Sequence, residues 1–244
     1  MALIGVLGGM GPLATVDFMD KVVRLTPATR DQEHLPMLVA NLPHIPDRSL
    51  AILDGASDPL PAMLAGIDLL NRNDVGLIVI PCNSAHHWYE QLRAHSTAPL
   101  LSIAEASIAA IPTAVRRVAV LATRGTLASG LYQTTLAARD IEPILPDEMA
   151  QVRIDACIRA SKAGDLDEGA VQLSAALAVL IAQGVRVAVM GCTEIPLAAR
   201  QLSAPSVTLI DSSLELARAT VAFAVERGWN LPQQEADGSR LSHA

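Results

Sequence analysis

The chain has 244 residues, of which 51% are hydrophobic and 18% are charged, and its formal net charge is −7. This length and composition predict a globular protein with one large domain or two small lobes. The acidic balance and the 2% aromatic content argue against a nucleic-acid binder, which would need a basic surface or rings for base stacking.

Strands and helices are expected to alternate along the first half of the chain. An apolar strand precedes the glycine-rich turn at residues 8–12, and a helix is expected from about 13 to 25. A 3.6-residue hydrophobic period predicts another helix around 63–70. Several prolines indicate a long ordered loop over 42–59. The expected strands of this half are residues 3–7, 37–40, 76–80 and 100–103.

The second half continues the alternation and sets the fold class. Apolar runs predict strands at 118–121 and 187–190, and Leu173, Leu177 and Leu180 form one stripe of a helix between them. Strands that alternate with helices predict an α/β fold with mostly parallel sheets. Residues 233–244 are polar and aperiodic, so we expect a flexible tail.

The start of the chain and its cysteines bear on location. The first residues lack a basic segment, and glycines interrupt the first apolar run, so a strand is expected there instead of a signal peptide. Uninterrupted apolar runs are too short to span a membrane. Three cysteines are not typical of a disulfide framework. We therefore expect a cytoplasmic protein without a membrane partner.

A weak internal repeat indicates how the chain is organised. Residues 4–15 align with 118–129, and residues 75–82 align with 185–192. Two similar lobes related by a pseudo-twofold axis, with the site in the cleft between them, are the natural interpretation. The expected division is 1–112 plus 211–232 for the N-terminal lobe and 113–210 for the C-terminal lobe.

The repeat places Cys82 and Cys192 at equivalent positions, each just past the carboxyl end of a strand. Open α/β sheets build their sites at that end, so two thiols could face one cleft from opposite sides. Inversion of a stereocentre next to a carboxylate needs a base on one face and an acid on the other, and a thiolate and a thiol can fill these roles. Possible donors or proton partners follow each cysteine, namely Asn83, Ser84, His86, Thr193 and Glu194.

Other interpretations of these residues remain open from the sequence. Cys82 and Cys192 could form a disulfide, or could bind zinc together with His86, although the spacing is not that of a structural zinc module. Residues 9–14 match the dinucleotide-binding fingerprint in its loosest form, without the acid expected near the ribose. Cys157 has no polar motif around it and is expected in the core.

Two cations are ambiguous by position alone. Arg48 lies in the proline-rich segment and could be a solvated surface charge. Lys162 is expected at the end of a helix, where a cation is favourable against the helix dipole. We expect both side chains to be partly exposed.

Four motifs together resemble the aspartate/glutamate racemase family, and within it the cofactor-independent aspartate racemases. They are residues 8–12, 46–48, 81–86 and 191–196. The resemblance implies two α/β lobes, no pyridoxal phosphate, no metal and usually a homodimer. It also implies that Cys82 and Cys192 are the two acid/base residues.

The same resemblance implies a set of substrate contacts. Asn83, Ser84 and Thr193 would hold the α-carboxylate and the amino group, with Met10 and Thr123 lining the cleft. Arg48 and Lys162 would take the side-chain carboxylate. The chain departs from the family pattern at Ser84, where threonine is frequent, at Leu13, where an acid is frequent, and at Glu194, where glutamate racemases usually carry histidine.

The sequence therefore predicts an amino-acid racemase that acts on an acidic small molecule, most specifically aspartate, without a cofactor. A glutamate or broad-specificity amino-acid racemase is one alternative, and an isomerase or decarboxylase of small diacids on the same scaffold is another. A nucleotide- or anion-binding protein without catalysis is the alternative from a different class.

Overall fold

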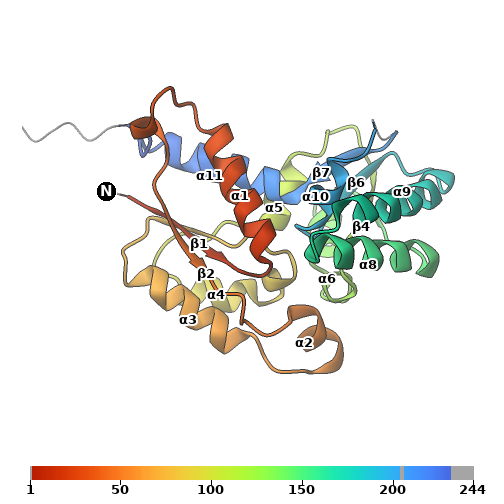
Figure 1. Cartoon of the computed structure of the whole chain (residues 1–244), viewed down its shortest axis with the longest axis horizontal. Coiled ribbons are helices and arrows are strands. Elements are labelled where there is room, and N and C mark those ends of the chain that lie inside the picture. Colours follow the sequence, from red (N-terminus) through yellow and green to blue (C-terminus); the bar gives the residue numbers. More distant parts are fainter. Residues whose placement is uncertain (1, 204–205, 232–244) are drawn as a thin grey trace, which may run out of the picture.

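The computed structural model describes residues 2–203 and 206–231. Two parallel β-sheets lie side by side, and helices flank each of them (Figure 1). This arrangement confirms the predicted α/β fold with two similar lobes. The predicted tail at 233–244 lies outside the described residues. No helix within the described residues combines the length and the apolar character needed to cross a membrane.

The N-terminal sheet has the order β2-β1-β3, with all strands parallel. Its strands are β1 (Ile4–Gly8), β2 (Met37–Asn41) and β3 (Leu77–Val79). The strand expected at 100–103 is reduced to one parallel bridge between Ile78 and Leu100. Ser102 accepts a hydrogen bond from the Glu105 amide, and this cap starts a helix at Ile103 instead of a longer strand.

The C-terminal sheet repeats this order as β5-β4-β6-β7, again with all strands parallel. Its strands are β4 (Arg117–Leu121), β5 (Glu142–Ile144), β6 (Val187–Met190) and β7 (Thr208–Asp211). In each sheet the first strand of the repeat pairs with the next strand on one side and with the third on the other. The strand orders therefore agree with the alignment of β1 with β4 and of β3 with β6.

The helices around the N-terminal sheet include one from the end of the chain. They are α1 (Pro12–Leu25), α2 (Arg48–Asp54), α3 (Leu60–Asn71), α4 (Tyr89–His95), α5 (Ile103–Ala109), α11 (Ser212–Val225) and the short 3₁₀ helices Asp31–Glu33 and Ser84–Trp88. Phe18 of α1 shares a buried core with Leu216 and Ala217 of α11. The chain thus returns to its first sheet after β7 (Figure 1).

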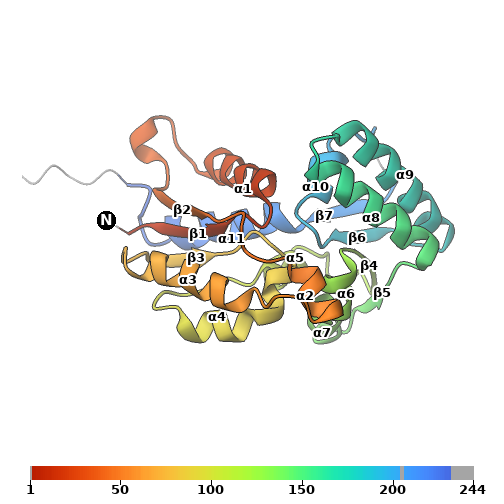
Figure 2. The same ribbon diagram turned by 60° about the horizontal axis from the view of Figure 1, so that its bottom comes forward.

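The helices around the C-terminal sheet include two long helices, α8 and α9, which pack against each other on one face (Figure 2). The full set is α6 (Arg124–Ala128), α7 (Leu131–Ala137), α8 (Glu148–Lys162), α9 (Leu166–Ala182) and α10 (Ile195–Ala199). The stripe that contains Leu173 and Leu180 is buried, as predicted. Cys157 is fully buried in the same core, which confirms its expected structural place.

The segment expected as a loop over 42–59 contains the helix α2, so that expectation is wrong. Asp47 caps this helix by accepting a hydrogen bond from the Leu50 amide at 3.0 Å. Gly55 ends it in the left-handed conformation, with φ of 61°. The prolines therefore lie on both sides of a short helix instead of in a continuous loop. Arg48 lies in the first turn of this helix.

Helix α2 reaches across to the C-terminal half and packs on α6 (Figure 2). The Ser49 hydroxyl donates a hydrogen bond to Thr123 Oγ1 at 3.0 Å. At Gly125 a Cβ atom would lie only 2.6 Å from the Ser49 Cα, so this close approach requires glycine. The contact therefore joins α2 to the helices of the C-terminal half.

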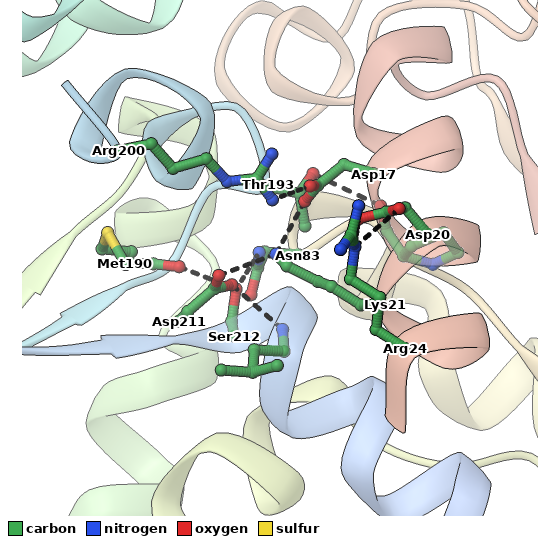
Figure 3. Close-up of polar contacts among 12 residues, drawn as sticks. Asp17, Asp20, Lys21, Arg24, Asn83, Met190, Thr193, Arg200, Asp211 and Ser212 are labelled. Atoms are coloured by element: carbon green, nitrogen blue, oxygen red, sulfur yellow. Dashed lines mark hydrogen bonds and ion pairs between the residues drawn. The ribbon is translucent and has the colours of Figure 1, made fainter. Parts of the chain in front are cut away.

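A charge cluster with a buried lysine at its centre joins the two halves on another side (Figure 3). Lys21 Nζ lies 2.6 Å from Asp17 Oδ2 and 2.7 Å from Asp211 Oδ2. Arg200, at the end of α10, pairs with the other oxygen of Asp17. Lys21 and Asp17 lie on α1, whereas Asp211 ends β7, so the cluster ties α1 to the C-terminal sheet.

Candidate active site

A small pocket lies between the carboxyl ends of the two sheets. Every site residue predicted from the sequence lines it, except His86; the residues are Met10, Arg48, Cys82, Asn83, Ser84, Thr123, Lys162, Cys192, Thr193 and Glu194. The pocket is also lined by four residues that were not predicted, namely Asp47, Ser49, Thr126 and Gly191. Asp47, Ser49 and Gly191 are sequence neighbours of predicted residues. Thr126 is not, and it reaches the pocket through the contact between α2 and α6.

Cys82 enters the pocket from the N-terminal half, three residues after β3 ends. Its Sγ lies 3.6 Å from the Ser84 hydroxyl, and the side chain is almost fully buried. Ser84 begins a 3₁₀ helix directly after the cysteine. The Cys82 thiol therefore has one polar neighbour, the hydroxyl of Ser84. Among the described residues, no carboxylate lies within hydrogen-bonding distance of this thiol.

His86 supports this segment from behind and does not line the pocket. Its Nε2 accepts a hydrogen bond from the Ile103 amide at 3.1 Å, which places the ring hydrogen on Nδ1. Nδ1 then donates to the Cys82 carbonyl oxygen at 2.8 Å. Burial lowers the pKa of His86 to about 4, so the ring is neutral at pH 7. His86 thus contacts the backbone around Cys82, as a donor to its carbonyl oxygen, and its supporting role at the site stays a prediction.

Cys192 enters from the C-terminal half, two residues after β6. Its Sγ donates a hydrogen bond to Glu194 Oε2 at 3.0 Å. Burial and the adjacent Glu194 carboxylate raise the pKa of this thiol well above its usual range, while the positive charge of Lys162 acts in the opposite direction. Cys192 is therefore a thiol at neutral pH in the unliganded protein.

Glu194 itself is unusual because it is a buried carboxylate with an unsatisfied oxygen. Its side chain is 3% exposed, and Oε1 has no hydrogen-bond partner in the described structure. An acceptor left in this state costs roughly 1–3 kcal/mol of stability. Each such group in a native protein needs an explanation, such as a catalytic role or a bound water or ion.

Asn83 is held in one orientation by Tyr132 of α7 and by Ser212, the first residue of α11. Its Oδ1 accepts from the Tyr132 hydroxyl at 2.6 Å, and its Nδ2 donates to Ser212 Oγ at 3.1 Å. Ser212 in turn donates to the Met190 carbonyl oxygen at 2.7 Å, as Figure 3 shows. Burial raises the pKa of Tyr132, which keeps its hydroxyl a donor. Neither Tyr132 nor Ser212 was predicted.

The two predicted cations differ in accessibility. Lys162 ends α8 and is exposed, as expected. Arg48 is 8% exposed, so its expected partial exposure is wrong. Its Nη atoms donate to the carbonyl oxygens of Ile45 at 3.1 Å, Pro46 at 2.8 Å and Met10 at 3.2 Å, and its Nε has no partner. Three carbonyls satisfy most of the guanidinium and allow its burial.

The described residues form neither of the two alternative arrangements of the cysteines, the disulfide and the zinc site. All three cysteines are free thiols, so Cys82 and Cys192 make no disulfide. Within residues 2–203 and 206–231, no group of three His, Cys, Asp or Glu side chains is arranged to hold a metal ion. The zinc alternative also fails on its own residues, because both ring nitrogens of His86 are engaged with the backbone.

Comparisons with known proteins agree with this geometry. Residues 7–220 match the family model described as Asp/Glu/Hydantoin racemase. The broad specificity amino-acid racemase RacX of Bacillus subtilis is 30% identical over 226 residues, which cover 90% of this chain and 97% of RacX.

Solved structures show the same fold. The Picrophilus torridus aspartate racemase superposes with a TM-score of 0.82 at 27% identity and covers 95% of this chain and 100% of its own. A glutamate racemase from Francisella tularensis, solved with D-glutamate, has a TM-score of 0.68 at 16% identity, with 93% of this chain and 82% of its own covered, and supports the fold alone. The chain belongs to the Asp/Glu/hydantoin racemase family and is an amino-acid racemase of that family.

Proposed function

We propose that this chain interconverts L- and D-aspartate by a two-base mechanism without a cofactor. The observation that carries the proposal is that Cys82 and Cys192, from equivalent positions after β3 and β6, line one pocket together with two cations. Thiols on opposite sides of a bound amino acid can serve the two faces of its α-carbon.

The proposed reaction moves one proton between the substrate and each of the two thiols. The Cys82 thiolate removes the α-proton of one enantiomer, and the electron pair of the C–H bond remains on the α-carbon. The Cys192 thiol then delivers its proton to the opposite face, so that Cys82 ends as the thiol and Cys192 as the thiolate. The other enantiomer reacts by the reverse steps. The raised pKa of Cys192 supports its role as the resting acid.

The remaining lining groups suit an acidic amino acid. The hydroxyls of Ser84 and Thr193 and the anchored amide of Asn83 are donors for the α-carboxylate. Lys162 is free to form a charge-assisted hydrogen bond with the side-chain carboxylate. Arg48 contributes positive charge beside it, although most of its donors already hold backbone carbonyls. The likeness to the Picrophilus torridus aspartate racemase supports aspartate.

Racemisation in deuterated water tests the proposal. The purified protein is incubated with L-aspartate in D₂O after dialysis against a chelator and without pyridoxal phosphate. We expect D-aspartate on chiral chromatography and loss of the α-proton signal by NMR. Activity that requires an added metal or pyridoxal phosphate, or a protein that leaves L-aspartate unchanged, would overturn the proposal.

A broad-specificity racemase is the second candidate. The similarity to RacX, which is named a broad specificity amino-acid racemase, favours this candidate. A second hollow next to the pocket has room for longer side chains and favours it too. A parallel assay with glutamate, asparagine and alanine separates this candidate from an aspartate-specific enzyme. The homodimer, the cytoplasmic location and the lobe boundaries stay predictions.

A further inference from the structure

A buried hydrogen-bond network lies behind the pocket and ends at one of its lining residues, Asn83. The Tyr132 hydroxyl donates to Asn83 Oδ1 at 2.6 Å. Asn83 Nδ2 donates to Ser212 Oγ at 3.1 Å, and Ser212 Oγ donates to the Met190 carbonyl oxygen at 2.7 Å (Figure 3). Tyr132 and Ser212 are fully buried, whereas Asn83 lines the pocket. The buried network therefore connects the protein interior to a side chain that a ligand can touch.

The hydroxyls of the buried network fix the orientation of the Asn83 amide. A hydroxyl has one hydrogen, and Ser212 uses it on the Met190 carbonyl oxygen, so Ser212 can only accept from Asn83. The reversed amide would place Oδ1 against the Ser212 oxygen with no hydrogen between them. Burial raises the pKa of Tyr132, so its hydroxyl keeps the proton that it donates to Oδ1. Both ends of the amide are thus assigned by their neighbours.

This orientation decides what Asn83 offers to a ligand. The amide nitrogen has two hydrogens, and the buried network uses one of them. The second N–H is left for the pocket, while the amide oxygen is engaged by the buried Tyr132. An N–H donor attracts a carboxylate, whereas an amide oxygen in its place would repel one. The network thus makes Asn83 a donor toward the substrate.

The buried network also spans the two segments that carry the thiols. Asn83 is the residue directly after Cys82, and Gly191 is the residue directly before Cys192. The ring of Tyr132 packs against Gly191, where a Cβ atom would lie only 2.8 Å from the ring carbon Cε2. This close approach requires glycine at position 191. One buried side chain therefore contacts both thiol segments, by its hydroxyl on one side and by its ring on the other.

We propose that Tyr132 and Ser212 are positioning residues of the racemisation, which aim one N–H of Asn83 at the α-carboxylate of the substrate. The inference rests on the proposed function, because it places that carboxylate beside the same two thiols. When a thiolate removes the α-proton, the electron pair left on the α-carbon is shared with the carboxylate, whose oxygens gain negative charge. A donor already aimed at these oxygens stabilises the developing charge more than the ground state. Tyr132 and Ser212 thus act on kcat through Asn83.

A double-mutant cycle tests whether Tyr132 acts through Asn83. Asn83→Ala should lower kcat by about 10²- to 10³-fold, as the removal of an oriented donor does. Tyr132→Phe removes one hydroxyl and should lower kcat by at least roughly tenfold, with KM changed by less than about threefold. In the Asn83→Ala background, the same Tyr132→Phe change should alter kcat by less than about twofold, because the group that it positions is gone.

Ser212→Ala is the second variant, and it tests the inference independently of the fold of Tyr132→Phe. We expect it to lower kcat by at least roughly tenfold, and this loss should also disappear in the Asn83→Ala background. Tyr89→Phe and Thr220→Val are the matched controls. Each removes a hydroxyl that donates to a backbone carbonyl, at 2.8 Å to Leu100 and at 2.7 Å to Leu216. Both controls should keep kcat within about twofold, and thermal denaturation compares the folding of all variants.

The outcomes separate this inference from the proposed function. Equal kcat losses for Tyr132→Phe in the natural and the Asn83→Ala backgrounds would overturn the inference, since they would show a structural role independent of Asn83. Unchanged kcat in both Tyr132→Phe and Ser212→Ala, or a loss confined to KM, would also overturn it. A natural sequence that leaves aspartate unchanged would overturn the proposed function alone. The cycle is then measured with the amino acid that the protein does racemise, because every amino acid carries the α-carboxylate.

Discussion

The two halves of the active-site pocket have the same backbone origin but different chemistry. Cys82 follows β3 and Cys192 follows β6, and these strands occupy equivalent places in sheets of the same strand order. The Cys82 thiol lies 3.6 Å from a hydroxyl, whereas the Cys192 thiol lies 3.0 Å from a carboxylate. The fold repeats, therefore, while the groups that control the two protons do not.

This asymmetry constrains what kinetics can reveal. L- and D-enantiomers have the same free energy in water, so kcat/KM must be equal in the two directions whatever the enzyme does. The difference between the two thiols must instead appear in the pH dependence, in proton exchange with solvent and in the separate kcat and KM values.

Removal of either thiol should have the largest effect. We expect Cys82→Ala and Cys192→Ala each to lower the racemisation rate by on the order of 10³-fold or more, because inversion needs a proton group on each face. Chiral chromatography of aspartate measures this loss. Exchange of the α-proton with D₂O could persist for the one enantiomer that the remaining thiol faces, which identifies the face served by each cysteine.

Cys157→Ala is the control for the thiol variants. Cys157 is fully buried in the core around α8 and α9, and burial raises its pKa to about 11, so it is not a thiolate at neutral pH. Its replacement should leave the racemisation rate within about threefold, although it removes buried atoms. A single Cys82 or Cys192 variant that racemised at a rate close to that of Cys157→Ala would contradict the two-base mechanism.

The junction between the halves should show the next largest effect, in stability. Lys21 is buried against Asp17 and Asp211, which belong to α1 and β7 (Figure 3). Lys21→Met leaves these carboxylates without their shared cation, so we expect the free energy of unfolding to fall by about 3–5 kcal/mol. Urea denaturation of both proteins measures this change.

Arg24→Ala is the surface counterpart on the same helix. Arg24 pairs with Asp20 at 2.7 Å, but both side chains are well exposed. Exposed ion pairs contribute about 0–1 kcal/mol, so this variant should unfold almost as the natural sequence does. Similar losses in Lys21→Met and Arg24→Ala would show that the buried cluster does not hold the halves together.

Local sequence patterns were sufficient to predict the two cysteines and the residues directly next to them. The repeat placed both cysteines after equivalent strands of the two sheets, and Asn83 and Thr193, which follow them directly in the sequence, line the same pocket. The three-residue strand β5 was missed because Pro143 interrupts its pattern, although proline is tolerated at a sheet edge, where β5 lies.

The supporting contacts could not be predicted because they link distant parts of the chain. Tyr132 and Ser212, which orient Asn83, are 49 and 129 positions away from it. The burial of Arg48 likewise depends on the carbonyl of Met10, 38 positions earlier. A single sequence carries no periodic signal for such contacts. They become visible only when the two sheets are placed next to each other.

The two cations should contribute unequally to substrate binding. Lys162→Ala removes an exposed donor from the pocket, so we expect kcat/KM for aspartate to fall by roughly 10- to 150-fold, equivalent to about 1.5–3 kcal/mol. Arg48→Ala should lower activity too, but it also releases three backbone carbonyls and should lower the melting temperature. Kinetics and thermal denaturation of both variants test this difference.

Arg159→Ala is the control for charge removal at the end of α8. Arg159 is exposed in the last helical turn but does not line the pocket, so its loss should leave kcat/KM for aspartate nearly unchanged. Alanine as a substrate provides the second comparison, since it lacks the side-chain carboxylate. An equal loss for aspartate and alanine in Lys162→Ala would contradict the assignment of Lys162 to that carboxylate.

Removal of the Glu194 charge should have the smallest effect at neutral pH and a definite direction elsewhere. Burial and the Glu194 carboxylate raise the pKa of Cys192, which keeps this thiol protonated and able to donate as the pH rises. Glu194→Gln removes the negative charge, so the pKa of Cys192 should fall and the thiol should lose its proton at lower pH. The alkaline limb of the kcat/KM profile should therefore move to lower pH, while the change at pH 7 stays below about tenfold, or about 1.4 kcal/mol. Glu226→Gln, which removes an exposed carboxylate outside the pocket, is the charge control. An alkaline limb that stayed in place or moved to higher pH in Glu194→Gln would show that Glu194 does not control the Cys192 proton, and the two halves of the site would then be chemically alike.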